Sequence, residues 1–170
     1  MMLEVALEAD GEWDSSTGPD WQVLAEAAVR AAIAESRYPH LTEAARPVEL
    51  ALRLTGDKEV RALNSEWRGK DKPTNVLSFP LADHAELTAP DQDGPELMLG
   101  DIVLARGVCA AEAADKAIPL DHHAAHLMVH GTLHLLGYDH HNETEADDME
   151  ARETRALARL GIGNPYEEAV

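Results

Sequence analysis

Residues 130–140 read HGTLHLLGYDH, and this stretch predicts the helix at the centre of the fold. Its three histidines stand at positions i, i+4 and i+10. Two side chains four residues apart lie on one face of a helix, one turn apart. Gly137 then lets the chain leave the helix. The stretch therefore predicts a helix that presents His130 and His134 together, and a turn that brings His140 beside them.

These three histidines indicate a metal site. Neutral imidazoles without a fourth protein ligand are typical of catalytic zinc, whereas a structural site is more often closed by cysteines, and this chain has one cysteine. Histidine pairs at this spacing also arise by chance on a solvated helix face. Against that, seven of the nine histidines fall between residues 122 and 141. We therefore expect one Zn²⁺ per chain, held by His130, His134 and His140.

The length and composition fit a single cytoplasmic domain, residues 1–170. A chain of 170 residues can bury enough surface to need no disulfide framework. The N-terminal residues lack the basic region of a signal peptide, and no apolar run approaches the roughly 20 residues that span a bilayer. We expect no membrane partner and a location in the cytoplasm.

The net charge of −18 argues against non-specific binding of nucleic acid, because a phosphate backbone repels such a surface. The charge is uneven, however. Arg68, Lys70 and Lys72 lie within five positions, whereas many acidic residues lie in segments 83–101 and 143–153. We therefore expect a local positive groove beside these three cations, on a chain whose acidic surface otherwise favours solubility.

Hydrophobic periodicity predicts four strands and five helices. The strands are expected at 2–8, 47–55, 75–79 and 101–105. The helices are expected at 20–36, 57–67, 107–117 and 121–136, with a last one after Asn142. Asp20, Asp121 and Asn142 are the expected N-caps, and residues 82–98 the expected surface loop. The predicted fold class is α+β, one domain with a mixed sheet of about four strands and a central histidine helix like that of zinc metalloproteases.

The spacing His-x3-His-x5-His, with a glycine three residues after the second histidine, is similar to that of the metzincin zinc peptidases. Those enzymes carry a glutamate directly after the first histidine, where it acts as general base. This chain has Gly131 there, which has no side chain. A zinc peptidase stays open as an alternative, and a carboxylate within reach of the metal would favour it.

A second segment, residues 67–80, reads WRGKDKPTNVLSFP. A guanidinium such as that of Arg68 can bridge two phosphate oxygens and stabilise the charge that grows during phosphoryl transfer. A zinc ion lowers the pKa of a bound water toward 7, so the two segments together favour hydrolysis of a phosphodiester. On the residues alone, an ordinary basic surface turn explains this segment equally well.

The two segments, followed by Leu-Gly-Asp-Ile at 99–102, resemble the YbeY family of bacterial and organellar endoribonucleases. The resemblance covers residues 60–80 and 99–141. It implies a zinc-dependent, single-strand-specific endoribonuclease that acts in 16S rRNA 3′-end maturation and in ribosome quality control. It also implies association with the small ribosomal subunit and with a GTPase assembly factor.

The resemblance implies a role for each matching residue. The three motif histidines become the zinc ligands, and Arg68 becomes the catalytic arginine that binds phosphate. Asn75 stands where the family often has aspartate, which is a departure from the family pattern.

Other residues are expected to support the site. The candidate substrate contacts are Lys70, Lys72, Ser78 and His126. Asp101 and Asp139 are candidates to orient a ligand imidazole through its second ring nitrogen. Tyr138 is expected to pack beneath the site. The acidic residues of the last helix are expected on a solvated face, at 143, 145, 147, 148, 150 and 153.

A function of a different class also stays open. The missing peptidase base and the acidic surface fit a ribosome-assembly factor whose zinc is mainly structural. That alternative predicts that loss of Arg68 spares assembly, whereas loss of His134 unfolds the protein.

Overall fold

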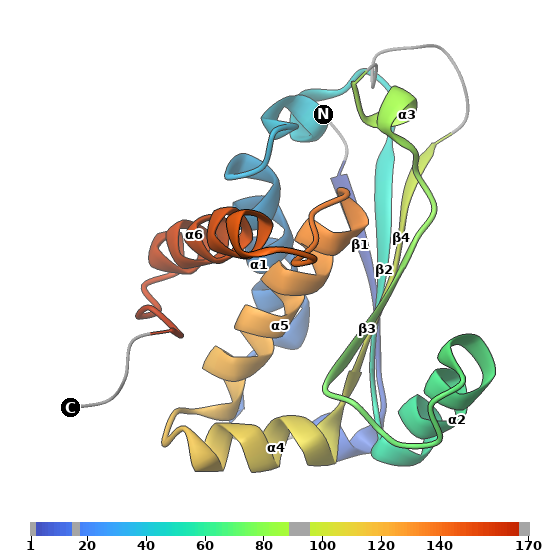
Figure 1. Ribbon diagram of the computed structural model, residues 1–170, viewed down its shortest axis with the longest axis vertical. Coiled ribbons are helices and arrows are strands. Elements are labelled where there is room, and N and C mark those ends of the chain that lie inside the picture. Colours follow the sequence, from blue (N-terminus) through green and yellow to red (C-terminus); the bar gives the residue numbers. More distant parts are fainter. Residues whose placement is uncertain (1–2, 15–17, 89–95, 167–170) are drawn as a thin grey trace.

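A four-stranded sheet lies at the centre of the computed structural model, which describes residues 3–14, 18–88 and 96–166 (Figure 1). The strands are β1 (Leu3–Ala9), β2 (Val48–Thr55), β3 (Val76–Pro80) and β4 (Leu97–Ala105). The α-helices are α1 (Trp21–Ala34), α2 (Asp57–Arg68), α3 (His84–Thr88), α4 (Arg106–Asp115), α5 (Leu120–Leu135) and α6 (Glu143–Arg159). Two short 3-10 helices cover Gly11–Trp13 and Pro39–Glu43. The α+β fold with a mixed sheet is confirmed.

The strand order β1-β2-β4-β3 leaves β3 at one edge of the sheet. β1 and β2 pair in parallel, as do β2 and β4, whereas β3 runs antiparallel to β4 with Ser78 opposite Ile102. Successive side chains of a strand point to opposite faces. The Ser78 face of β3 therefore borders the end of α5, whereas its Leu77 face packs beneath α2 with Val60 and Val103.

Gly100 allows β3 and β4 to approach each other closely. The β2–β4 register shifts here, so that Leu50 pairs with Gly100 and Leu99 is left unpaired. Gly100 has φ +142°, and a Cβ at this position would lie 2.3 Å from the carbonyl oxygen of Phe79. Glycine adopts this backbone conformation without steric cost, so the bulge depends on it.

The histidine helix α5 packs against one face of the sheet and is surrounded by α1, α4 and α6 (Figure 1). Most of its residues are buried, including Met128, Val129 and Leu133. The expected N-caps of α1 and α6 are confirmed, because Asp20 accepts hydrogen bonds from two backbone amides and Asn142 from that of Glu145. The prediction of a central, buried histidine helix is therefore confirmed.

Three differences from the sequence-based expectation stand out, whereas the bounds of the other predicted elements shift by at most two residues. Strand β4 begins at Leu97 rather than 101, because its first residues continue the ladder with β2. The expected loop 82–98 holds the short helix α3, so the described part of the chain has six α-helices rather than five. Helix α5 begins one residue early, with Pro119 rather than Asp121 as its N-cap, and Asp121 instead accepts a hydrogen bond from the His122 amide.

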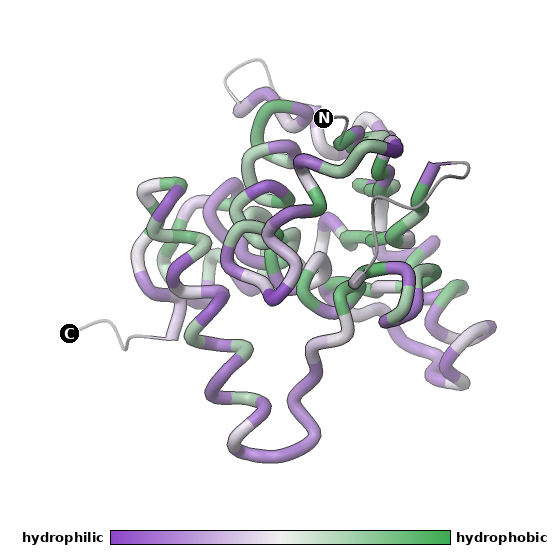
Figure 2. The backbone as a smooth tube through the Cα atoms, turned by 90° about the horizontal axis from the view of Figure 1, so that it is seen from above, coloured by the Kyte–Doolittle hydropathy of each residue, from purple (hydrophilic) through white to green (hydrophobic). Residues whose placement is uncertain are grey.

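Hydrophobic residues gather in the interior of the chain trace, and the outer turns are mainly hydrophilic (Figure 2). The main core lies between the sheet and helices α1, α5 and α6, with Leu52, Ile102 and Leu104 fully buried in it. Among the helices in the described ranges, none is both long enough and apolar enough to cross a membrane.

Candidate metal centre

The three motif histidines come together at the C-terminal end of α5. His130 and His134 lie one turn apart, with their Nε2 atoms 3.0 Å from each other. Gly137, with φ +96°, turns the chain back so that His140 reaches the same point. One ring nitrogen of each histidine lies within 4.8 Å of the others. The local sequence thus builds this cluster from one helix end and one turn.

The Nδ1 atoms of His130 and His134 each form a hydrogen bond within the protein. His130 Nδ1 donates a hydrogen bond to the carboxylate of Glu153, and His134 Nδ1 donates to the carbonyl oxygen of Tyr138 at 2.8 Å. The Nε2 atoms are therefore the ring nitrogens that face each other and are left to bind a metal. Two nitrogens at 2.0–2.1 Å from one tetrahedral zinc are about 3.3 Å apart. The donor set and its spacing fit a divalent zinc ion.

The ring of His134 stays neutral at physiological pH. Burial disfavours its charged form, and the neighbouring His130 adds to this effect, so that the pKa of His134 is lowered to about 4. Metal binding requires a deprotonated ring nitrogen. His134 can therefore accept a cation near pH 7 without first losing a proton.

Glu153 is a residue of this centre that the sequence analysis missed. It was expected on the solvated face of α6, but the structure buries it completely, with 0 % of its surface exposed. The same face of α6 carries the buried residues Met149, Ala156 and Leu157. Glu153 follows Met149 by four residues and precedes Leu157 by four, so helical periodicity could have placed it on the apolar face.

Glu153 remains ionised despite its burial. Desolvation raises the pKa of a carboxyl group, but the nearby His126 and the hydrogen bonds from His130 and Tyr166 outweigh this effect and lower the pKa of Glu153 to about 2. Burial and the adjacent Glu153 carboxylate both raise the pKa of Tyr166, so its hydroxyl keeps its proton and donates a hydrogen bond to Glu153. A carboxylate therefore stands behind His130.

A cleft of about 750 Å³ opens in front of the histidines. Its lining comes from the end of α2, from β3 and the two residues before it, and from α5 and the turn after it: Arg68, Thr74, Asn75, Val76, Ser78, Pro80, His130, His134, Gly137, Tyr138, Asp139, His140 and His141. The predicted residues Arg68 and Ser78 thus share one cleft with the three histidines. Of these lining residues, Arg68 carries the permanent positive charge.

The end of α2 places Arg68 at the cleft. Gly69 has φ +67°, and its amide and that of Lys70 donate to the carbonyls of Ser65 and Asn64, both at 3.2 Å. The left-handed Gly69 and the bond from its amide to Ser65 form the αL arrangement of a helix C-terminus. Among the described residues, no carboxylate pairs with Arg68, so its guanidinium is free to bind an anion.

The other candidate substrate contacts lie elsewhere. Lys70 and Lys72 are exposed beyond the end of α2 and do not line the cleft. Between them, Asp71 pairs with Arg61 at 2.9 Å. His126 is buried one turn before His130, and its Nε2 lies 3.2 Å from the Tyr166 hydroxyl. The structure therefore brings only Arg68 of the three predicted cations to the histidines.

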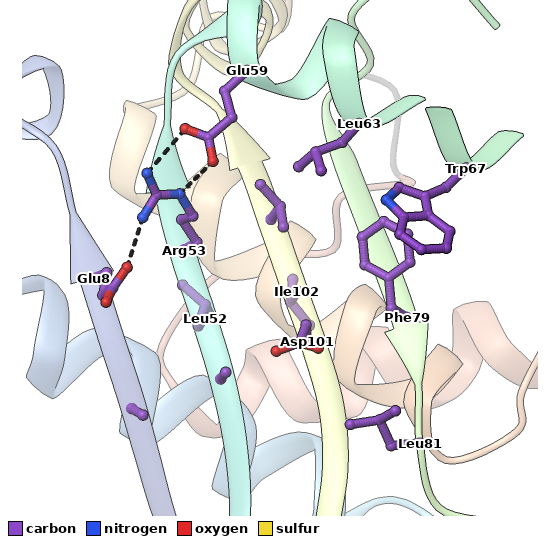
Figure 3. Close-up of a pocket in the computed structure, with 13 residues that line it drawn as sticks. Glu8, Leu52, Arg53, Glu59, Leu63, Trp67, Phe79, Leu81, Asp101 and Ile102 are labelled. Atoms are coloured by element: carbon purple, nitrogen blue, oxygen red, sulfur yellow. Dashed lines mark hydrogen bonds and ion pairs between the residues drawn. The ribbon is translucent and has the colours of Figure 1, made fainter. Parts of the chain in front are cut away.

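Neither aspartate is well placed to orient a ligand imidazole. Asp139 Oδ2 lies 2.8 Å from His141 Nε2, whereas Asp139 Oδ1 is 3.9 Å from His140 Nδ1. Asp101 lies on the opposite face of the sheet (Figure 3). Glu153 and the backbone of residue 138 take over the expected orienting role. Tyr138 packs in the core as expected, and its hydroxyl accepts a hydrogen bond from the Arg37 amide at 2.8 Å.

That opposite face holds a separate hollow of about 640 Å³ beneath α2. Trp67 and Phe79 stand at its edge, with ring centroids 6.5 Å apart, and the Arg53 side chain binds Glu8 and Glu59 at its other side (Figure 3). The sheet separates this hollow from the cleft, because Phe79 and the cleft-lining Ser78 point to opposite faces. No motif histidine lines it.

Gly131 faces the sheet rather than the cleft. A Cβ at this position would lie 3.0 Å from Ile102 Cγ2 and 3.1 Å from Ile102 Cδ1. A side chain directly after the first histidine would therefore meet Ile102 of β4. This close packing explains why the helix carries glycine directly after the first histidine.

Comparison with known proteins agrees with this geometry. The family described as Endoribonuclease YbeY matches residues 13–161. A protein of that name from Rhizorhabdus wittichii is 52% identical over 166 residues, covering 97% of each chain. Another from Sphingopyxis alaskensis is 52% identical over 167 residues, covering 97% of this chain and 98% of the relative.

A solution structure of a protein from Thermotoga maritima shares the fold. The match has a TM-score of 0.53 and 19% identity, and it covers 98% of this chain and 99% of the other. The sequence matches span the segments that form the cleft, including the three motif histidines and Arg68. This chain therefore belongs to the YbeY family of endoribonucleases.

Proposed function

We propose that this protein is a zinc-dependent endoribonuclease that cleaves single-stranded RNA. The proposal rests above all on one observation, the convergence of three imidazoles and the unpaired guanidinium of Arg68 on a single cleft. The names of the relatives give the reaction class, because each relative described above by sequence is called an endoribonuclease.

The three motif histidines form the proposed metal-binding site, and the bound metal ion would supply the chemistry. A zinc ion bound by His130, His134 and His140 would act as a Lewis acid and would activate a water molecule at neutral pH. His130 and His134 keep their Nε2 lone pairs aimed at one point because Glu153 and the Tyr138 carbonyl hold their Nδ1 protons. The protein thus needs no rearrangement of these two rings to bind the ion.

Arg68 binds the substrate phosphate. Its guanidinium can donate two parallel hydrogen bonds to phosphate oxygens and stabilise the negative charge that grows as the phosphodiester breaks. The Ser78 hydroxyl, on the cleft face of the edge strand, can donate to the same backbone. An open cleft of this kind admits a single strand, whose backbone and bases are free to bend into it.

The cellular role that we propose is maturation of the 16S rRNA 3′ end and ribosome quality control in the cytoplasm. It implies the small ribosomal subunit as the site of action and a GTPase assembly factor as a partner. This part of the proposal follows the family to which the chain belongs. Cells that carry Arg68→Ala as their only copy should accumulate 16S rRNA with unprocessed 3′ ends.

The direct test is an RNA cleavage assay with the zinc-loaded protein. We expect cleavage of a labelled single-stranded RNA, and no cleavage of the same sequence annealed to its complement. Arg68→Ala should lower the rate by about 10²–10³-fold, the cost of removing one donor to a developing anion. Arg68→Lys should lose less, because lysine keeps the charge but not the bidentate geometry.

Lys72→Ala serves as the matched control, since it removes one exposed positive charge from the same loop outside the cleft lining. Circular dichroism spectra of all variants should match that of the wild type. A folded, metal-loaded wild type that cleaves neither RNA would contradict the proposal. In that case an assembly factor with structural zinc becomes the better account, especially if Arg68→Ala leaves 16S rRNA maturation unchanged in cells.

A further inference from the structure

A hydrogen-bond network with a fully buried carboxylate at its centre lies next to His130, and its outer member, Tyr166, is 43% exposed. Its centre is the carboxylate of Glu153, from α6. His130 Nδ1 donates to Oε1, and the hydroxyl of Tyr166 donates to Oε2. His126 Nε2 lies 3.6 Å from Oε2 and 3.2 Å from the Tyr166 hydroxyl. Three parts of the chain therefore meet at one carboxylate: α5, α6 and the segment after α6.

The burial of Glu153 is unusual because no lysine or arginine in the described part of the chain pairs with it. Carboxylates are almost never fully buried unless they are paired, since burial of an unpaired charge is costly. The groups that surround Glu153 are two imidazoles and a phenol, which carry no permanent positive charge. A divalent cation at the other nitrogen of His130 would supply the missing charge through that ring.

Tyr166 determines which carboxylate oxygen of Glu153 binds His130. Because the Tyr166 hydroxyl donates to Oε2, with His126 Nε2 3.6 Å from the same oxygen, Oε1 is left for His130. A carboxylate fixed at one oxygen cannot rotate away from the imidazole that the other oxygen holds. This arrangement fixes which nitrogen of His130 carries the proton, and so which nitrogen faces the cleft.

We infer that Glu153, held in place by Tyr166, is a positioning residue that keeps His130 Nε2 directed at the metal and raises the affinity of the centre for it. The inference rests on the metal-binding part of the proposed function and concerns neither RNA nor cleavage. The segment after α6, which contains Tyr166, thereby becomes part of the support of the metal centre.

The test measures zinc affinity by competition with a chromogenic chelator. Glu153→Gln keeps the shape of the side chain but removes its charge, and we expect it to weaken zinc binding by about 10–100-fold, as is usual for partners of metal-bound histidines. Tyr166→Phe should weaken binding by a smaller factor, because the carboxylate stays charged but is no longer held. Glu150→Gln is the matched control, because Glu150 also lies on α6 and lines, with Glu153, His130 and Tyr166, a small hollow of about 310 Å³. Among the described residues, no hydrogen bond or ion pair joins its side chain to a motif histidine, so Glu150→Gln should leave the affinity unchanged.

A second readout separates positioning from simple structural support. In the zinc-loaded wild type, ¹H–¹⁵N NMR should detect a slowly exchanging proton on His130 Nδ1, and Glu153→Gln should shift it and speed its exchange. Absence of that proton in the wild type would overturn the inference, even if Glu153→Gln fails to fold. A folded Glu153→Gln with wild-type affinity, or an equal loss in Glu150→Gln, would also overturn it.

These outcomes differ from those that would refute the proposed function. If the wild type binds no zinc, the proposed function fails and the positioning role fails with it. If the wild type binds zinc and cleaves RNA but Glu153→Gln binds zinc equally well, only the positioning role fails. Unchanged affinity in Tyr166→Phe alone would overturn the role given to Tyr166.

Discussion

Replacing His134 with alanine is expected to abolish tight zinc binding and to lower cleavage of single-stranded RNA by about 10³-fold or more. The reason is that Lewis-acid activation contributes several kcal/mol, and each 1.36 kcal/mol is a factor of ten in rate. The protein itself should stay folded, because His134 lies at the edge of the cleft and alanine favours helix. Zinc titration and a single-turnover cleavage assay would measure the two effects.

His141→Ala provides the matched control for this prediction. His141 lines the same cleft but does not belong to the cluster of three histidines. Its loss should leave zinc affinity near that of the wild type. Zinc should also raise the melting temperature of the wild type and of His141→Ala, but not that of His134→Ala, because a ligand stabilises only the state that binds it. Equal zinc stabilisation of all three proteins would contradict the assignment of His134.

Replacing Gly131 with glutamate, the residue of the zinc peptidases, is expected to destabilise the protein by about 3–5 kcal/mol, the cost of an uncompensated buried charge. The new side chain would meet Ile102 of β4 rather than enter the cleft, since even its Cβ would lie 3.0 Å from Ile102 Cγ2. The variant should gain no peptidase activity. Urea unfolding monitored by circular dichroism would give the change in free energy of unfolding.

Gly11→Glu is the control for the same substitution at an open site, because nothing lies within 4 Å of a Cβ placed there. We expect the free energy of unfolding of that variant to lie within about 0.5 kcal/mol of the wild-type value. A Gly131→Glu protein as stable as Gly11→Glu would show that α5 can move away from β4. It would also reopen the peptidase alternative, since the glutamate would then have room to turn toward the histidines.

Much of this architecture could be predicted from local sequence patterns. The i, i+4 spacing of His130 and His134, and the glycine before His140, placed three imidazoles together because helix geometry and a left-handed turn act over a few residues. The caps Asp20 and Asn142 were predicted for the same reason, since each side chain bonds amides two or three residues away. The start of β4 was not, because a strand extends as far as its partner β2 pairs with it.

The histidine helix, the α+β class and the resemblance to the YbeY family could all be predicted from the order of residues, because these depend on short-range periodicity and on long motifs. The residues that surround the metal centre, in contrast, are set by contacts between elements far apart in the chain. Glu153 reaches His130 through the packing of α6 on α5, across 23 positions of the chain. Asp101, close to the motifs in sequence, lies on the far side of the sheet because side chains alternate along β4. Such contacts depend on long-range packing, which a local pattern of residues does not predict.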